Sequence, residues 1–479
     1  MADSGRMARR IVIIGAGFSG TVLAANLLRR ATQPLTVTLV DAVEPGQGLA
    51  YAQRNHPFLL NVSAGRMSAS AQRPAEFLDF ARRSHPDATA EDFLPRALYG
   101  EYLRSVLRDA QAQAPAWVSL ECIKGRVVAI RRPTPGGAQL RLSDGRDLTA
   151  DEVVLASGNP PPARLRGSEP LLGSPAYLEN PWSAPLHFRR GETVLLVGTG
   201  LTMADIAGAA AADTDGWITL HAISRHGLLP RTQTPIAHGA FEADPRPLLH
   251  AAAFSVRQLL RQVRQLARQA ETRGNDWHDV ITFVRGHAPA LWQRLPDREK
   301  RRFLRHLSAW WDVHRHRLPL ATSAALEALR ASRTLDVHAG RILSMVSEGN
   351  GARVNWRPRG ESAPRSLRVD RVINCTGPDY DCRRTRDPLL AELFAAGIAS
   401  PCPLGLGLRT TDHGALLDAR GNPVQGFYYI GPMLRPGYWE CTAASELRTH
   451  AENLAQHLSG SIAARPSTPL PSTHRTRAN

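Results

Sequence analysis

The residues best suited to chemistry in this sequence are three glycines, Gly15, Gly17 and Gly20, in the pattern G-x-G-x-x-G. In such a pattern the first glycine permits a tight turn, the second lets backbone amides approach a pyrophosphate, and the third lets a helix pack closely on a strand. The positive end of the following helix then faces the phosphates. The pattern predicts a dinucleotide site, although a glycine-rich turn in another kind of α/β protein would also fit.

The flanking sequence supplies the elements that would position this turn. A β-branched run from Ile11 to Ile14 precedes it, a helical pattern from Thr21 to Arg30 follows, and a second run, Thr36 to Val40, ends at an acid. An acid about twenty residues beyond the turn can accept hydrogen bonds from both hydroxyls of an adenosine ribose. We therefore predict that a dinucleotide is held by Gly15, Gly17, Phe18, Ser19, Gly20 and Asp41.

A second unit opens in the same way. The strand Glu192 to Val197 leads into a helix start that contains Gly198 and Gly200, and Trp217 to Ile223 is the next strand. The third glycine of the motif is absent. The second strand ends in Ser224-Arg225. An acid at this place would favour NAD, whereas a serine with an arginine favours the 2′-phosphate of NADPH. A solvent-exposed Arg225 without a ligand is the alternative.

Charge and composition limit the ligands. The chain has 479 residues and a formal net charge of +16, and only Lys124 and Lys300 are lysines, so the other 57 of the 59 basic residues are arginines. The arginines are scattered through every segment, which argues against nucleic acid and favours small anionic ligands.

The length predicts two or three domains.

Cysteine usage and the apolar runs predict a cytoplasmic protein. Five cysteines stand far apart without a C-x-x-C pair, which excludes a zinc ribbon and a redox dithiol of the usual spacing and suits a reducing compartment. Met1 to Arg9 is polar and lacks the features of a secretory signal. No run of about 18 apolar residues occurs, so no membrane span is expected.

A helical region separates the second unit from the strands that follow it. Helical patterns cover Leu248 to Arg273 and Arg298 to Arg317, and the second ends with His314 and His316. Two residues apart on a helix, these imidazoles point away from each other, so we expect no metal site. An arginine–histidine patch around an anion, or a packed helix end, remains open for this segment.

Two similar segments indicate where the chain crosses between domains. Leu155 to Pro160 and Ile373 to Pro378 both run from a strand through a small residue and a glycine to a proline. We interpret them as crossings at matching points of the two units. Ser459 to Asn479 is rich in Ser, Thr, Pro and Arg, and is expected to be disordered.

Two dinucleotide units in one chain resemble the flavoproteins in which FAD lies in a first domain and NAD(P)H docks on an inserted second one. The resemblance implies an α/β fold with two Rossmann-like domains, the second inserted into the first, plus a helical insertion. The expected parts are an FAD domain at 8–165 and 366–460, an NAD(P)H domain at 188–365 with the insertion at 245–330, and a tail at 461–479.

The same resemblance assigns further residues. It places the backbone of Val127 against the adenine and aims the positive end of a helix starting near Trp439 at the isoalloxazine. Other expected FAD neighbours are Asn61, Met67, Gly158, Gly377 and Gly431. The nicotinamide cofactor would be held by Gly198, Gly200, Ser224 and Arg225.

A narrower likeness is to a bacterial group of FAD/NAD(P)-binding proteins. The motifs are Gly48-Leu49-Ala50-Tyr51, His56 to Val62, Pro95 to Gly100, Gly198 to Thr202, Ile223 to Arg225, His314 to Arg317 and Asn374 to Gly377. Members of this group include a FAD-dependent urate hydroxylase and amino-acid N-monooxygenases that oxidise aspartate to nitrosuccinate. The resemblance implies that NAD(P)H reduces FAD, that O₂ adds to form a flavin hydroperoxide, and that the protein supplies only a dry, oriented pocket.

The first substrate hypothesis is urate, hydroxylated to 5-hydroxyisourate. A small anionic substrate would suit a pocket drawn from Arg96, Tyr99, His314, Arg315, Arg317 and Trp439. Arg96 and Tyr99 could instead be a helix start with a tyrosine packed beneath it. The alternatives are an N-monooxygenase of an aspartate-like amino acid and a non-catalytic FAD-binding or sensor protein. The lack of a dithiol disfavours a disulfide reductase, and a homo-oligomer is left open.

Overall fold

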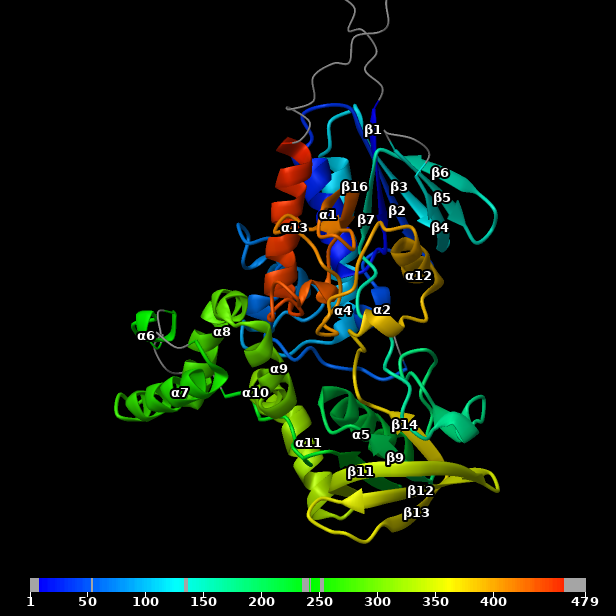
Figure 1. The fold of residues 1–479 in the computed structure, drawn as a ribbon, viewed down its shortest axis with the longest axis vertical. Coiled ribbons are helices and arrows are strands. Elements are labelled where there is room, and N and C mark those ends of the chain that lie inside the picture. The colour runs from blue at the N-terminus through cyan, green and yellow to red at the C-terminus, as the bar shows by residue number, and fades with distance from the viewer. Residues whose placement is uncertain are drawn as a thin grey trace, which may run out of the picture.

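Strand β1 (Arg9–Ile14) is apolar on both faces because helices or strands cover both sides of the sheet that contains it. In the computed structural model (Figure 1), which describes residues 8–52, 55–132, 137–234, 241, 243–249 and 254–460, Ile11 and Ile13 face one core and Val12 faces another. Side chains alternate along a strand, and a sheet buried on both faces therefore needs apolar residues at successive positions. This explains the unbroken β-branched run.

The first sheet has the strand order β15-β16-β7-β1-β2-β3, parallel except for β15. Helices α1, α4 and α13 cover one face, and a small sheet, β4-β5-β6, covers the other with α12. The bounds not given above are β2 (Leu35–Asp41), β3 (Val118–Lys124), β7 (Glu152–Leu155), β15 (Ala415–Leu417), β16 (Pro423–Tyr429), α1 (Phe18–Arg30), α4 (Arg96–Ala112), α13 (Ala444–Gly460), α12 (Pro388–Ala395), β4 (Val127–Arg131), β5 (Ala138–Leu142) and β6 (Asp147–Ala150).

The second sheet has the order β13-β12-β11-β10-β9-β14-β8, in which β8 to β11 are parallel and β11 to β13 form an antiparallel meander. Helices α5 and α11 pack against one face. The bounds are β8 (Tyr177–Leu178), β9 (Thr193–Val197), β10 (Thr219–Ser224), β11 (Leu335–Glu348), β12 (Gly351–Pro358), β13 (Arg365–Val369), β14 (Arg371–Asn374), α5 (Leu201–Thr214) and α11 (Leu320–Ala331). Because β14 pairs with β9, the second unit extends to Asn374, past the expected boundary at 365.

The region expected to be a helical insertion holds a group of helices that project from the side of the molecule (Figure 1). They are α6 (Arg246–Leu249), α7 (Val256–Glu271), α8 (Trp277–Arg294), α9 (Asp297–His306) and α10 (Ser308–Arg315). The pattern from Arg298 to Arg317 predicted one helix, but the structure interrupts it at Leu307. None of the described helices is both long and apolar enough to cross a membrane. The predicted tail, 461–479, lies outside the described residues.

Further short elements complete the described chain. They are α2 (Gly48–Tyr51), α3 (Glu76–Ala81), η1 (Ala64–Arg66), η2 (Glu169–Leu171), η3 (Cys382–Arg384) and η4 (Pro432–Leu434). The chain lies side by side with itself where the two crossing segments end: Pro162, two residues after the first segment, forms an antiparallel bridge with Pro378, and the Asp379 amide donates to the Pro161 carbonyl over 3.1 Å. The chain therefore passes between its two sheets through one paired connection.

We expect alanine at Gly20 and at Gly208 to have opposite effects on stability. A Cβ at Gly20 would lie 1.9 Å from the Gly15 carbonyl oxygen, whereas a Cβ at Gly208, which is exposed on α5, would meet nothing within 4 Å. Gly208→Ala should raise the free energy of unfolding by about 1 kcal/mol through helix propensity. Gly20→Ala should lower it, together with the amount of FAD retained after purification. Urea unfolding and flavin absorbance measure both, and equal effects at the two sites would contradict this account.

Candidate functional site

A cavity of about 860 Å³ opens between the two glycine-led turns. This volume lies within the range of about 300–1,000 Å³ that is usual for small-molecule sites. The first unit contributes the turn and the acid of the expected dinucleotide site, and the second contributes the start of α5. Among the lining residues are Gly15, Gly17, Phe18, Ser19, Asp41, Gly158, Leu201, Thr202, Asp205, Gly377, Pro432 and Thr442.

The first turn has the geometry that a pyrophosphate site requires. Gly15 adopts a φ of +107°, and a Cβ there would lie 2.3 Å from the Ala156 carbonyl oxygen, so only glycine fits. At Gly17 the nearest atom to an added Cβ would be the Gly48 Cα, at 3.7 Å. Gly17 also lines the cavity, so its backbone is accessible from there. Asp41 accepts hydrogen bonds from the amides of Ala16 at 2.6 Å and Val43 at 3.1 Å, which orient its carboxylate.

The remaining residues predicted to bind FAD are distributed differently. Gly158 and Gly377 line the cavity at φ +69° and +78°, whereas Asn61, Met67, Val127 and Gly431 are not among its lining residues. Met67 and Val127 are buried. The carbonyl of Asn61 accepts from the Gln233 side chain over 3.3 Å. The expected role of Val127 beside an adenine stays a prediction.

The second turn repeats the construction of the first. Gly198 has a φ of +114°, and a Cβ there would lie 2.5 Å from the Cys375 carbonyl oxygen. Gly200 caps α5 in open space. The Ser224 hydroxyl oxygen accepts a hydrogen bond from the Gly227 amide at 3.0 Å and lies 2.9 Å from Thr199 Oγ1. Arg225 is exposed and follows directly after β10, and its expected contact with a nicotinamide cofactor stays a prediction.

Arg96 and Tyr99, which were substrate-pocket candidates, are engaged with protein groups. Arg96 lines the cavity, but it donates to the Leu59 carbonyl at 3.0 Å and pairs with Asp205 of the second domain at 2.8 Å. Tyr99 is completely buried, and its hydroxyl donates to the Met67 carbonyl over 2.7 Å. The open alternative, a helix start with a packed tyrosine, is therefore what the structure shows for Tyr99.

The region around Trp439 differs from the expected helix start. Helix α13 begins at Ala444, and Glu440 accepts hydrogen bonds from Trp311 Nε1 at 2.8 Å and Arg315 Nε at 2.6 Å. Trp439 itself packs against Trp292 with ring centroids 4.9 Å apart. The buried Glu440 carboxylate thus joins the helical insertion to the segment that precedes α13.

An arginine cluster surrounds Glu440. Arg285 lies 3.8 Å from Glu440 and also pairs with Glu446 in the first turn of α13. Within the part of the chain that the structure describes, the buried atoms Arg285 Nε, Arg315 Nη2 and Arg435 Nε have no hydrogen-bond partner. Such orphaned guanidinium donors are costly unless a ligand accepts from them. Thr442 and Leu447, close by in sequence, line the large cavity.

Burial and the repulsion between neighbouring positive charges shift the pKa values of groups in this cluster. Burial, with the charges of Arg315 and Arg285, lowers the pKa of Arg317 to about 10. Burial and then three arginines lower the pKa of His316 to about 3, whereas burial raises the pKa of Asp312 to about 6. His316 and Asp312 still keep 38% and 48% of their side-chain surfaces accessible. His316 is therefore neutral near pH 7, and the arginines carry the positive charge.

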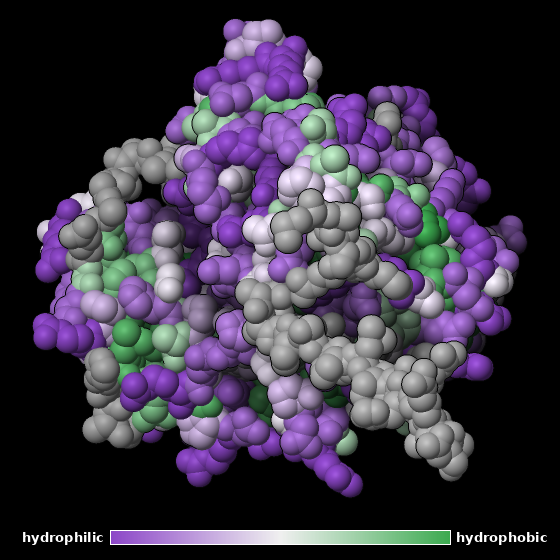
Figure 2. Space-filling view, turned by 90° about the horizontal axis from the view of Figure 1, so that it is seen from above, coloured by the Kyte–Doolittle hydropathy of each residue, from purple (hydrophilic) through white to green (hydrophobic). Residues whose placement is uncertain are grey.

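A second, apolar cavity of about 480 Å³ lies within the helical insertion. Its walls come from α7, α8, α9 and α10, and they include His314, Trp310, Trp311 and Trp439. His314 Nδ1 lies 2.7 Å from the Trp310 carbonyl, and Arg317 donates to the His314 carbonyl. The predicted His314–Arg317 patch is thus divided between this apolar cavity and the arginine cluster. Figure 2 shows apolar surface within hydrophilic surroundings on the flank where Figure 1 places α6 to α8.

Sequence reasoning missed Arg285, Asp205 and the central role of Glu440. Arg285 interrupts an otherwise apolar face of α8, between Val284 and Ala288, and this break was a usable signal. Asp205 follows the glycine turn at α5, where its charge had no evident local partner. Partners of both residues lie more than a hundred positions away, at Glu446 and Arg96, so no local pattern identifies them.

The first sheet and its glycine turn define a nucleotide-binding domain, and a second parallel sheet with a similar glycine turn follows it in the chain. Residues 12–160 match the family model described as FAD-NAD(P)-binding, so this part of the chain is an FAD/NAD(P)-binding domain. The structure of L-lysine 6-monooxygenase from Pseudomonas syringae superposes with a TM-score of 0.61 at 16% identity, covering 94% of this chain and 99% of that one. At this identity the likeness shows the fold, which matches the predicted α/β architecture.

Two curated relatives share sequence with the chain. Nitrosuccinic acid synthase of Aspergillus oryzae is 26% identical over 272 residues, 51% of this chain and 40% of the relative. The nitrosuccinate-forming L-aspartate N-monooxygenase of Streptomyces cremeus is 30% identical over 250 residues, 41% of this chain and 36% of the relative. The matches thus span about two fifths of the relatives' lengths.

We expect Arg96 and Asp205 to be energetically coupled, because removal of either side chain would leave the other partly buried without its charge partner. Their side chains are 21% and 12% exposed, and burial raises the pKa of Asp205 while Arg96 opposes that rise. A double-mutant cycle with Arg96→Ala and Asp205→Ala should give about 1–3 kcal/mol of coupling in urea unfolding. The control pair Arg190–Asp215, 58% and 79% exposed, should give less than about 1 kcal/mol. Equal coupling in both pairs would count against a structural role for Arg96.

The lowered pKa of His316 predicts an acid-sensitive site. Between about pH 6.5 and 3 the unfolded histidine binds a proton and the folded one does not, so the stability that depends on neutral His316 falls as pH decreases. Asp312, with its pKa raised to about 6, acts in the opposite direction as pH falls below 6. His316→Gln should make the loss of unfolding free energy between pH 6.5 and 4 shallower. His306→Gln, at an exposed position on α9, is the control and should leave the slope unchanged.

Proposed function

We propose that the protein is an FAD-dependent N-monooxygenase that uses NADPH and O₂ to oxidise the amino group of a small, aspartate-like amino acid. The observation that carries this proposal is the arginine cluster: Arg315 is buried, and its Nη2 lacks a partner among the described residues. Planar guanidinium groups hold carboxylates through paired hydrogen bonds. The sequence likeness to nitrosuccinate-forming enzymes supports the same substrate class. Both observations favour the amino-acid alternative over urate.

The residues of the large cavity fit an FAD pyrophosphate and ribose. Gly15, whose amide donates to the Val40 carbonyl, would shape the turn, and Gly17 would bring its backbone amide to the phosphates. Asp41, oriented by the Ala16 and Val43 amides, would accept from the ribose. When bound, FAD supplies hydride acceptance and oxygen activation. Arg225 would take the NADPH 2′-phosphate.

The substrate would be oriented by charge and held in a dry setting. Arg315 and Arg285 would bind carboxylates, while Glu440 and Trp311 fix the direction of the Arg315 guanidinium. Neutral His316 adds no positive charge, so a substrate ammonium group is not repelled from that side. Exclusion of water strengthens each of these contacts and limits wasteful loss of activated oxygen.

We expect aspartate to stimulate NADPH oxidation by the FAD-loaded protein in air, with an N-oxidised product and little hydrogen peroxide. The assay compares NADPH with NADH, and aspartate with ornithine, lysine and urate, and measures peroxide and product together. Stimulation by urate alone would reinstate the urate hypothesis. Absence of oxidation of either nucleotide would instead support a non-catalytic FAD-binding protein.

Arg315→Lys should raise the KM for aspartate about tenfold or more, because a lysine cannot form the paired contact and about 1.5–3 kcal/mol of charged hydrogen bonding is lost. Arg298→Lys on α9, where the side chain is 83% exposed, is the matched control and should not change KM. An unchanged KM in Arg315→Lys, with FAD content equal to wild type, would remove the arginine cluster from the substrate site.

A further inference from the structure

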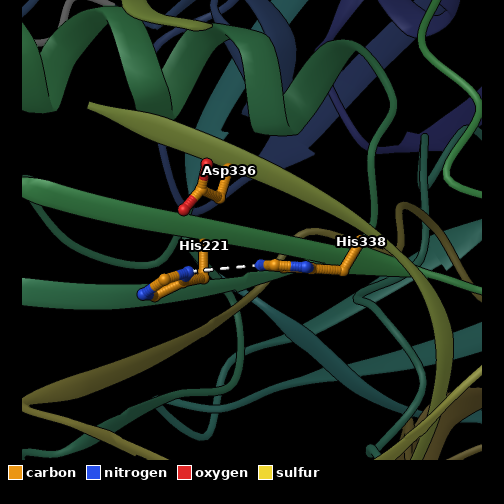
Figure 3. A group of neighbouring side chains, drawn as sticks. All are labelled: His221, Asp336 and His338. Carbon is orange, nitrogen blue, oxygen red and sulfur yellow. Dashed lines mark hydrogen bonds between the residues drawn. The ribbon is translucent and has the colours of Figure 1, made fainter. Parts of the chain in front are cut away.

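Three side chains with metal-binding atoms meet on neighbouring strands of the second sheet. His221 lies on β10, and Asp336 and His338 lie on β11 (Figure 3). The parallel register places Asp336 opposite His221 and His338 opposite Ile223. Because side chains two residues apart share a face of a strand, both β11 groups lie on the face that carries His221.

The separation of the two imidazoles matches the spacing of ligands on a tetrahedral ion. His221 Nδ1 and His338 Nε2 are 3.3 Å apart, and one ligand atom from each of the three residues lies within 4.8 Å of the others. Two nitrogens at about 2.0–2.1 Å from zinc in tetrahedral geometry are about 3.3–3.4 Å apart. In Figure 3 the two rings point toward each other and the Asp336 carboxylate extends toward His221. The exposed Asp336 side chain has room to rotate onto an ion between them.

The site formed by His221, Asp336 and His338 is packed against protein on one side and open on the other. Both histidines are half-buried, and the Trp356 ring packs 5.1 Å from that of His338. Arg365 brings an opposing positive charge toward His338, but its guanidinium donates to the Glu361 carboxylate at 2.8 Å. Two imidazoles and one carboxylate suit zinc and similar divalent transition metals, and three protein ligands leave a position for water.

We propose that His221, Asp336 and His338 bind one zinc-class divalent cation, with water completing the coordination, and that this ion clamps β10 to β11. The site is separate from the large cavity and from His314 and His316, whose helical spacing was the reason to expect no metal. Its placement is specific: β10 ends at Ser224, three residues beyond His221, immediately before the predicted contact with the NADPH 2′-phosphate. Bound metal would hold that strand end in place. The alternative is a hydrogen bond between two imidazoles with no metal function.

The test uses the full chain without a histidine tag, freed of metal by a chelator and then titrated with Co²⁺ and Zn²⁺. One equivalent of Co²⁺ should produce the visible absorption of a low-symmetry, four-coordinate site, Zn²⁺ should displace it, and Zn²⁺ should raise the midpoint of thermal unfolding. Asp336→Asn, His221→Gln and His338→Gln should each lose the Co²⁺ spectrum and the zinc-dependent shift.

Two controls keep the result interpretable. His226→Gln changes a histidine that contacts Arg359 instead of the cluster, and it should retain both signals. Asp336→Asn alters an exposed side chain, so its metal-free unfolding should match that of the wild type, which separates lost binding from lost folding. Failure of the wild type to bind either ion, or undiminished binding in the three cluster variants, would overturn the proposal.

Discussion

The structure depends on two close backbone approaches at the carboxyl ends of its parallel strands. At Gly15 a side chain would collide with the Ala156 carbonyl, and at Gly198 it would collide with the Cys375 carbonyl. In both units the strand that follows in the sheet leaves its last carbonyl against the glycine of the turn. This contact leaves no room for a Cβ, and both glycines adopt left-handed φ values that other residues rarely tolerate. In each unit, the same backbone contact therefore sets both the geometry of the glycine turn and the point where the chain leaves the sheet.

The position of the cavity follows from that constraint. Each crossing segment leaves its sheet beside a glycine turn, and the Pro162–Pro378 bridge pairs the two segments. Ligands of open α/β sheets bind at the carboxyl ends of the strands, and here two such edges share one cavity. The Arg96–Asp205 ion pair, which joins the first residue of α4 to the fifth residue of α5, then fixes one domain against the other. Arg96, although it lines the cavity, can thus stabilise the arrangement of the two domains without contacting a substrate.

Charge is concentrated where the helical insertion meets α13. A buried carboxylate such as Glu440 is expensive unless it is paired, and Arg315 and Trp311 supply the partners. The Arg285 and Arg315 donors that remain without partners among the described residues are buried, and contacts of the same guanidinium groups with Glu446 and Glu440 hold them in position. The positive charges of Arg315, Arg435 and Arg285 add to burial in keeping His316 neutral. The apolar cavity of the insertion shares Trp311 with this cluster, because that side chain lines the cavity and donates to Glu440.

Local sequence determined the glycine turns, the acid at Asp41, the buried strands and the two crossing segments, because each depends on residues close together in the chain and on backbone conformation. The pairing of the two segments through Pro162 and Pro378 was decided by the tertiary structure. Local sequence also determined the class of cofactor, since a pyrophosphate contacts consecutive amides. Tertiary structure alone decided that Tyr99 is a core residue, that Arg96 belongs to Asp205, and that α13 begins at Ala444 with Glu440 as an arginine partner. It also decided that His221 meets His338. These pairings join residues about a hundred or more positions apart. The energy of a charge or an imidazole depends on the groups that surround it, and only packing brings those groups together.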